Sequence, residues 1–248
     1  MLKNRIVEID NLKKEIDFYR PLTTPIPDML KEYFRIGLTY SSNALEGNTL
    51  TETETKIILE DGLTIGGKTL REHFEVIGHS KAYDFMLSKI QNNTFSENDI
   101  CQLHHLFYYL IDQEYAGIYR KVPIFVTGTD FTFPKPLEVP MLMEEFMQEI
   151  PLYKERYHPV HYAALIHAKL VTIHPFVDGN GRTARLLMNL ALLQSGYVIT
   201  IIPPIMRPTY LSTIRQANKG ALTPFLEFIS EMVYESSKEY LRLIRSTV

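Results

Sequence analysis

The chain has 248 residues, of which 45% are hydrophobic and 22% charged, and its formal net charge at pH 7 is -3. This composition is typical of a soluble globular protein, and the lack of excess positive charge argues against nucleic-acid binding. No apolar run reaches the length of a membrane span, the first residues lack the apolar segment of a signal peptide, and the one cysteine, Cys101, excludes an internal disulfide. We therefore expect a cytoplasmic protein with no nucleic-acid and no membrane partner.

Helical periodicity dominates the first part of the chain, where it predicts helices over 28–45, 51–61, 70–90 and 96–111. The first of these ends at Glu46-Gly47-Asn48, and Gly47 is suited to a left-handed cap. Thr51 and Ser96 are expected N-caps, because each precedes the acidic residues of a first helical turn. We interpret residues 1–93 as an N-terminal helical region.

The pattern changes at Gly117. An apolar, β-prone stretch over 122–127, the turn-forming Gly128-Thr129-Asp130 and a second aromatic stretch predict one small β-hairpin within 117–136. Helices are expected again over 140–150, 159–172, 182–195 and 207–218, and from 224 to the end. The predicted fold class is therefore all-α with one small hairpin, in which residues 94–248 form the main core.

A polar, glycine-containing segment, HPFVDGNGRTAR at 174–185, separates two apolar helical patterns. Its glycines let a ligand approach the backbone, and the free N–H groups of the helix that opens near Gly181 form an anion site. Two arginines three residues apart on one helix face can each bind phosphate oxygens. A carboxylate suited to Mg²⁺ and an imidazole suited to proton transfer lie in the same segment. The segment predicts a nucleotide site, with an ordinary turn as the alternative, and it lacks the spacing of P-loop and Rossmann sites.

Residues 174–185 resemble the Fic motif, His-Pro-Phe-x-(Asp/Glu)-Gly-Asn-Gly-Arg-x-x-Arg, with every fixed position present. The resemblance implies a Fic-type (Fido) helical fold and a protein adenylyltransferase, which transfers AMP from ATP to a Ser, Thr or Tyr hydroxyl of a target protein. It implies that His174 is the base, that Asp178 binds Mg²⁺, with Mn²⁺ as an alternative, and that Phe176 anchors the loop. The phosphate-binding residues it implies are Gly179, Asn180 and Gly181 as the anion hole, Arg182, and Arg185 on the γ-phosphate.

The resemblance extends beyond this loop. Gly117-Ile118-Tyr119-Arg120 and the following hairpin resemble the Fic flap, which implies that the target segment binds along the hairpin as an added strand. Tyr210 and the segment around Asn218 resemble the C-terminal part of the family, where Asn218 would contact the adenine. Its alternative role is an ordinary helix cap. Relatives often form dimers, so a homodimer is a further expectation.

Ser42 and Glu46 lie four residues apart and therefore on one helix face. A carboxylate at a helix C-terminus faces the negative end of the dipole, which favours a basic partner for Glu46. The segment resembles the inhibitory motif (Ser/Thr)-x-x-x-Glu-(Gly/Asn) of self-inhibited Fic proteins, with the inhibitory helix at about 28–46. This resemblance implies that Glu46 pairs with Arg185 and competes with the γ-phosphate. In some relatives the same glutamate also assists removal of AMP from a modified target.

Two other interpretations compete with this one. The same fold could transfer UMP, phosphocholine or a phosphoryl group, or the chain could be a catalytically silent helical module that senses nucleotide. The intact set His174, Asp178, Arg182 and Arg185 favours the adenylyltransferase. The histidines at 158, 161 and 167 lack a metal-ligand spacing and are expected to be caps or core residues.

Overall fold

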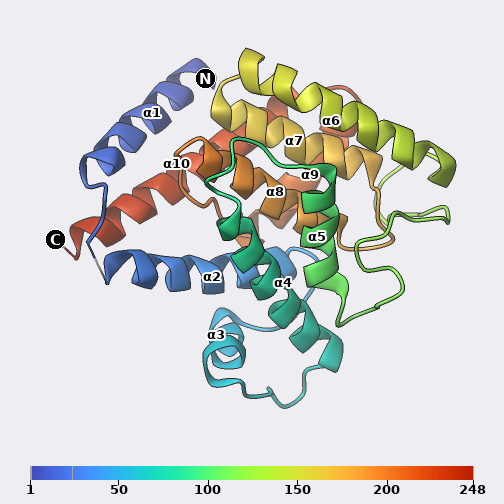
Figure 1. Ribbon diagram of the computed structural model, residues 1–248, viewed down its shortest axis with the longest axis horizontal. Helices are drawn as coiled ribbons and strands as arrows, with labels where there is room; N and C mark the ends of the chain where they lie inside the picture. The colour runs from blue at the N-terminus through green and yellow to red at the C-terminus, as the bar shows by residue number, and fades with distance from the viewer. Residues whose placement is uncertain (1, 24, 248) are drawn as a thin grey trace.

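The computed structural model describes residues 2–23 and 25–247 and is mainly helical (Figure 1). The N-terminal helices are α1 (Leu2–Phe18), α2 (Ile26–Ala44), α3 (Glu52–Asp61), α4 (Leu70–Ser88) and α5 (Glu97–Tyr108). They are followed by the 3₁₀ turn η1 (Pro136–Glu138), α6 (Val139–Arg156), α7 (Pro159–Ile173), α8 (Asn180–Gln194), the 3₁₀ turn η2 (Pro204–Met206), α9 (Arg207–Asn218) and α10 (Thr223–Arg245). The all-α prediction is confirmed for the described residues, which contain no strand.

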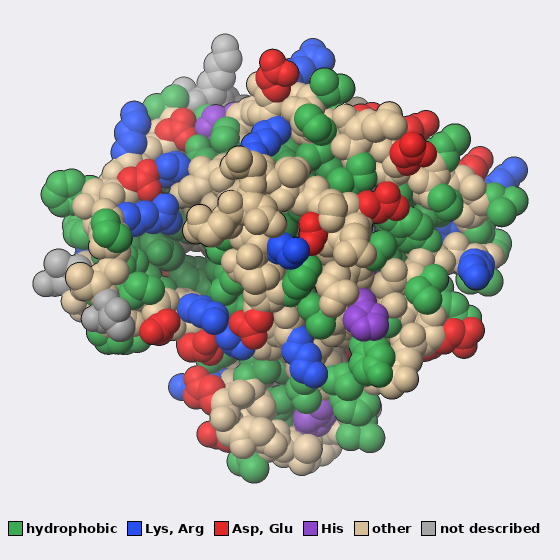
Figure 2. Space-filling model, viewed as in Figure 1, with side chains coloured by type: hydrophobic (Ala, Val, Ile, Leu, Met, Phe, Trp, Pro, Cys, Tyr) green, Lys and Arg blue, Asp and Glu red, His purple; other side chains and the backbone are tan. Residues whose placement is uncertain are grey.

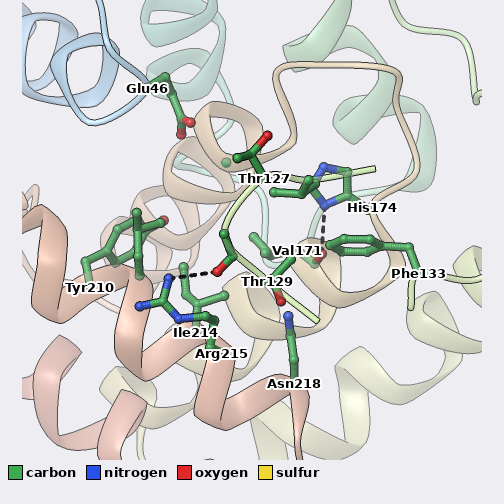
Figure 3. A pocket seen from close by; sticks show the side chains of 14 residues that line it. Glu46, Thr127, Thr129, Phe133, Val171, His174, Tyr210, Ile214, Arg215 and Asn218 are labelled. Atoms are coloured by element: carbon green, nitrogen blue, oxygen red, sulfur yellow. Dashed lines mark hydrogen bonds between the residues drawn. The ribbon is translucent and has the colours of Figure 1, made fainter. Parts of the chain in front are cut away.

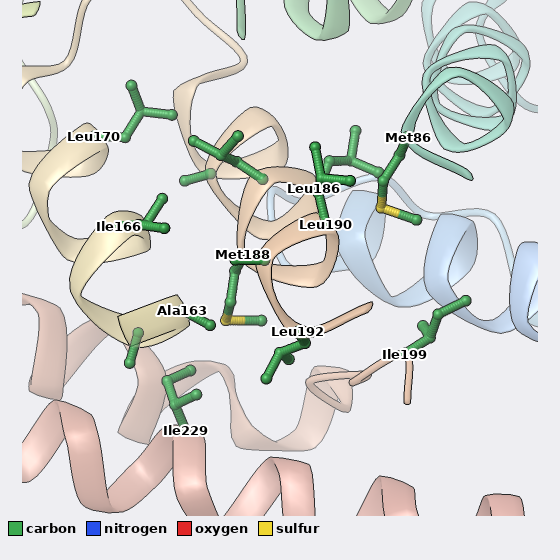
Figure 4. Packing of buried hydrophobic residues seen from close by; sticks show 14 of the residues in the cluster. Met86, Ala163, Ile166, Leu170, Leu186, Met188, Leu190, Leu192, Ile199 and Ile229 are labelled. Carbon is green, nitrogen blue, oxygen red and sulfur yellow. The ribbon is translucent and has the colours of Figure 1, made fainter. Parts of the chain in front are cut away.

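Helix α8 is the centre of the structure. Its apolar side chains from Leu186 to Leu192 are fully buried, and α7, α4, α5 and α2 pack against it. Figure 4 shows Leu186 near Met86 of α4 and the end of the Met188 side chain beside Ala163 of α7. A helix that is apolar on all sides is stable only inside such a shell. The core therefore holds rigidly the helix that follows the predicted nucleotide loop.

Local capping sets where several helices begin. Capping boxes open three helices, at Thr51, Thr69 and Ser96. In each box the cap hydroxyl accepts a hydrogen bond from the backbone N–H three residues later, and the acidic side chain of that later residue accepts one from the backbone N–H of the cap. The predicted caps Thr51 and Ser96 are thus confirmed. The left-handed conformation expected at Gly47 is also confirmed, with φ at 100°.

Helix α1 is not among the elements expected from the sequence. It lies along α10, the last helix of the described chain (Figure 1). Ile9 and Ile16 are its fully buried apolar side chains, and Phe18 at its end is exposed. Two buried residues that lie two helical turns apart give only a weak helical pattern in the sequence. Most of the stability of such a helix comes from its packing against another segment, here α10.

The predicted β-hairpin at 117–136 is not present as a pair of strands. The chain runs out and back with a turn at Thr127-Gly128, but neither limb forms strand hydrogen bonds. The buried Arg120 guanidinium joins the limbs instead, donating to the carbonyl oxygens of Val122 at 3.3 Å and Pro134 at 2.6 Å. Prolines at 123, 134 and 136 also remove backbone donors that a ladder needs. We call residues 117–136 the flap.

Acidic and basic side chains are interspersed over the face shown in Figure 2, with no extended area of one sign. Among the helices of residues 2–23 and 25–247, none combines the length and apolarity needed to cross a membrane.

A close helix crossing tests this packing. At Gly78 of α4 a Cβ atom would collide with the carbonyl oxygen of Phe107 in α5, which is backbone and cannot rotate away. We expect Gly78→Ala to lower the free energy of unfolding by about 3 kcal/mol, since overpacking forces the helices apart. The matched control is Gly66→Ala in an exposed turn with open space around it, expected to change stability by less than about 1 kcal/mol. Urea denaturation measures the free energy of unfolding of both variants. If Gly78→Ala were as stable as Gly66→Ala, the close contact between α4 and α5 would be contradicted.

Candidate active site

The loop between α7 and α8 is a braced turn. Buried Asn180 accepts a hydrogen bond from the N–H of Phe176 and donates one to its carbonyl oxygen, both at 2.9 Å. Phe176 is itself fully buried, and its ring stacks on His104 with centroids 3.8 Å apart. Gly179 precedes α8 with φ at 76°, a left-handed conformation that glycine adopts without strain. These contacts fix the loop before any ligand binds.

His104 of α5 holds the loop from behind. Its Nδ1 accepts a hydrogen bond from the N–H of Gly117 at 2.9 Å, so Nε2 carries the proton. Nε2 therefore donates to the carbonyl oxygen of Asp178 at 3.0 Å. Burial lowers the pKa of His104 to about 4, which keeps it neutral. No sequence pattern connected His104 with Asp178.

His174 ends α7 with φ at 53°, an unusual conformation for a residue with a side chain. Its Nδ1 donates to the carbonyl oxygen of Val171 at 3.0 Å, since a carbonyl can only accept. Nε2 is therefore the basic nitrogen, and it is left to accept a proton. Burial lowers the pKa of His174 to about 4, and the positive charge of Arg120 acts in the same direction. The imidazole is neutral at pH 7, as a general base must be.

Arg185 is a fully buried cation in the second turn of α8. Its Nε donates to Ser42 Oγ at 3.0 Å, and Nη2 donates to the Ser42 carbonyl oxygen at 2.8 Å. Nη1 donates to the hydroxyl of Tyr210 at 3.0 Å, which lies 2.8 Å from His167 Nε2. Nη2 also donates to Glu46 Oε1 at 2.7 Å. The structure thus brings Ser42, Glu46 and Arg185 together.

Glu46 lies in the turn directly after α2. Burial favours its neutral form, but the positive charges of Arg185 and Arg182 outweigh this effect and lower the pKa of Glu46. Arg207 Nε donates to the Leu45 carbonyl oxygen at 2.7 Å and fixes the turn. Gly181 makes the approach possible, because a Cβ atom at that position would collide with Glu46 Oε1.

Asp178 and Arg182 belong to a group of four charges. Asp178 Oδ1 accepts hydrogen bonds from the Gly179 N–H at 2.6 Å and from Arg182 Nη2 at 3.3 Å. Arg182 Nη1 lies 3.0 Å from Glu75 Oε1, and Arg71 Nη2 donates to Asp178 Oδ2 at 2.6 Å. Burial favours the neutral acid at Asp178, but Arg182, the Gly179 N–H and Arg71 together lower its pKa.

This donor set fits a divalent cation that arrives with phosphates. Among the residues that the structure describes, no three His, Cys, Asp or Glu side chains converge into an all-protein metal cage. Mg²⁺ typically binds through one or two carboxylates together with substrate phosphate oxygens and waters. The ionised carboxylate of Asp178 meets that requirement.

A cavity of about 140 Å³ lies over the N-terminus of α8. Glu46 lies at one end and Asn218 at the other, with His174 beside flap residue Phe133 (Figure 3). Asn218 Oδ1 accepts a hydrogen bond from the Thr172 hydroxyl at 2.8 Å. Of the predicted residues, Glu46, His174, Gly181 and Asn218 line the cavity, whereas the Arg182 guanidinium lies against Glu75.

The other histidines have structural surroundings. His158 caps α7 by accepting from the Val160 N–H, and buried His167 contacts Tyr210, in agreement with the expected cap and core roles. The residues that sequence reasoning missed are Arg71, Glu75, His104 and Arg207. Each meets the site from a segment distant in sequence, so no local spacing could have indicated it.

Residues 94–192 match the model of the Fic/DOC family. The chain superimposes on Fic-1 from C. elegans with a TM-score of 0.88 and 30% identity, covering 100% of this chain and 74% of that one. The chain belongs to the Fic/DOC family. A Fic-domain signaling protein from Bacteroides thetaiotaomicron also matches, with a TM-score of 0.89 and 28% identity over 96% of this chain and 98% of that one.

Curated relatives carry the name protein adenylyltransferase Fic. The relative from Drosophila grimshawi is 34% identical over 241 residues, which is 96% of this chain and 49% of the relative. The relative from Drosophila willistoni is 38% identical over 204 residues, or 82% of this chain and 41% of the relative. The chain thus spans less than half the length of these relatives.

The protonation of His174 can be measured directly. We expect its imidazole to titrate at about 4 in NMR spectra, because burial opposes the charged form. Glu46→Gly should lower this pKa further, since the Glu46 carboxylate is one of the groups that raise it. The resonance is assigned by its loss in His174→Asn. Titration near the ordinary value of 6.5 would show that the imidazole is solvated.

Proposed function

We propose that this chain is a protein adenylyltransferase that transfers AMP from ATP to a Ser, Thr or Tyr hydroxyl of a target protein, and that Glu46 inhibits it. The observation that carries the proposal is the pairing of Glu46 with Arg185 at the N-terminus of α8, beside the neutral imidazole of His174. The names of the curated relatives support the same activity. In this proposal residues 1–93 are regulatory and residues 94–248 hold the catalytic core.

The reaction is a displacement at the α-phosphorus of ATP. His174 Nε2 takes the proton of the target hydroxyl as the hydroxyl oxygen bonds to the α-phosphorus. The bond from that phosphorus to the oxygen bridging to the β-phosphate breaks, and pyrophosphate leaves with the electron pair. Such chemistry depends mainly on positioning and charge stabilisation. The Val171 carbonyl supports this role because it fixes the tautomer of His174.

The phosphates would lie against the first turn of α8. Gly179, Asn180 and Gly181 precede or open that helix, where free N–H groups and the helix dipole favour an anion. Arg185 would bind the γ-phosphate, and Arg182 would add positive charge and orient Asp178. Mg²⁺, or Mn²⁺, held by Asp178 would neutralise negative charge on the α- and β-phosphates.

The adenine would lie at the far end of the cavity. Asn218 lies there together with Leu211 and Ile214 of α9, so an amide stands beside an apolar wall. Its side-chain oxygen accepts a hydrogen bond from the Thr172 hydroxyl, and this contact fixes the orientation of the amide. The amide N–H groups are then the part of the side chain that can donate to a ligand. We assign Asn218 to contact with the adenine ring of ATP.

The target segment would bind along the flap. Apart from Pro123, which has no N–H, the backbone N–H groups from 122 to 127 make no backbone hydrogen bond to the described residues, and the side chain of Phe125 is 96% exposed. An extended segment with free donors can accept another chain as an added strand. Phe133 of the flap contacts the His174 ring, with centroids 4.5 Å apart, so a bound target lies near the base.

Inhibition follows from competition for Arg185. The Glu46 carboxylate takes one N–H of this guanidinium and holds negative charge where a γ-phosphate would lie. ATP could then bind only with its γ-phosphate displaced, which turns the α-phosphorus away from in-line attack. Ser42 and Tyr210 would keep Arg185 in place when Glu46 leaves.

Removal of the carboxylate tests this inhibition. We expect Glu46→Gly to raise AMP transfer from labelled ATP by about tenfold or more, because Arg185 becomes available to the γ-phosphate. Intact-mass spectrometry identifies the added group, and parallel reactions with UTP, GTP and CDP-choline test the other transferases. The control is Glu60→Gly, whose carboxylate pairs with Lys56 on the surface of α3. Unchanged transfer in Glu46→Gly, or transfer of another group, contradicts the proposal.

A second variant tests the base. His174→Asn keeps a residue that tolerates the left-handed backbone but removes the proton acceptor. In the Glu46→Gly background we expect it to slow transfer by about 10²- to 10⁴-fold. Nucleotide binding measured by calorimetry should change by less than about threefold. Transfer at the parental rate would exclude His174 as the base.

A further inference from the structure

Four charged side chains form a closed ring beside the catalytic loop. Asp178 contacts Arg182 and Arg71, and each of these arginines also contacts Glu75, at 3.0 Å from Arg182 and 3.4 Å from Arg71. Two positive and two negative charges alternate around the ring and cancel. Arg71 and Glu75 belong to α4, whereas Asp178 and Arg182 belong to the loop and α8.

The two oxygens of Asp178 have different surroundings. Oδ1 faces inward, where the Gly179 N–H and Arg182 hold it, and the Arg182 side chain is 3% exposed. Oδ2 faces outward and forms an ion pair with Arg71, whose side chain is 53% exposed. The inner contacts are thus built into the loop. The outer contact joins two partly solvated groups and is weak enough for a competitor to displace.

We propose that Arg71 is a positioning residue for the metal-binding carboxylate. Its Nη2 donates a hydrogen bond to Asp178 Oδ2 at 2.6 Å and competes with the divalent cation for that oxygen. Arg71 therefore sets the concentration of cation at which the site fills. The inference rests on the proposed function, in which Asp178 binds Mg²⁺. Arg71 is a cation at the oxygen that the metal would use, and two cations repel each other there.

Glu75 gives Arg71 a second place to go. Its Oε1 already lies 3.4 Å from Arg71 Nε, so the guanidinium can leave Asp178 and remain paired. Glu75 is itself fixed, since Oε2 accepts a hydrogen bond from Asn48 Nδ2 at 2.9 Å. Arg71 is therefore displaced over a short path instead of being released into solvent.

Manganese binding tests the proposal without relying on transfer. Mn²⁺ in the presence of a non-hydrolysable ATP analogue is titrated by electron paramagnetic resonance, with the full chain and its variants. We expect Arg71→Gln to bind Mn²⁺ about fivefold more tightly than the parent, an effect that shrinks in high salt. Arg71→Lys should remain close to the parent, because it keeps the charge.

Two further variants define the outcomes. Arg35→Gln removes an exposed pair with Asp84 outside the site and should leave Mn²⁺ affinity unchanged, while Asp178→Asn should abolish binding. Equal Mn²⁺ affinities for the parent and Arg71→Gln would overturn the role of Arg71 and leave the proposed function standing. If, in the Glu46→Gly background, the protein binds Mn²⁺ with the analogue equally well with and without Asp178→Asn, Asp178 is not a metal residue and both proposals fall. Thermal unfolding confirms that the variants are folded.

Discussion

The burial of Arg185 is the constraint on which the site depends. A guanidinium with no access to water must have its charge and its N–H groups satisfied by protein or by a ligand. Here the partners come from two separate segments: the end of α2 and the turn after it, with Ser42 and Glu46, and α9, with Tyr210. The arrangement leaves one place for a negative group at the N-terminus of α8. A carboxylate of the same chain fills it in this structure, and a phosphate suits the same place.

The rest of the loop is built to keep that place constant. Asn180, Phe176 and His104 brace the turn from inside, and the αL conformation of His174 turns the imidazole towards the cavity. In the proposed function, regulation acts through side chains that reach this loop from other segments, while the loop itself remains unchanged. Both Glu46 and Arg71 reach the loop from the N-terminal part of the chain, one with negative and one with positive charge.

Much of this could be predicted from the sequence where the information is local. The loop at 174–185, the cap residues Thr51 and Ser96, and the conformation of Gly47 follow from neighbouring residues alone. Helix α1 could not be predicted, because its two buried isoleucines gain their meaning from α10. The strand pairing expected in the flap failed because Arg120 joins the limbs with its side chain. Arg71 and Asp178 are 107 residues apart in sequence, so only the fold could bring them together.

Because Gly181 has no side chain, the Glu46 carboxylate and, in the proposed function, a nucleotide phosphate can use the same space beside Arg185. Glu46 approaches Arg185 through the space that a Cβ atom would fill, and a phosphate that replaced the carboxylate would need the same space. A larger residue there would expel the carboxylate but would also close the site to nucleotide. In the proposed function, changes that relieve the inhibition are therefore expected in α2, in the turn after it or in the contacts that fix that turn, because a larger residue at Gly181 would exclude the carboxylate and the nucleotide together.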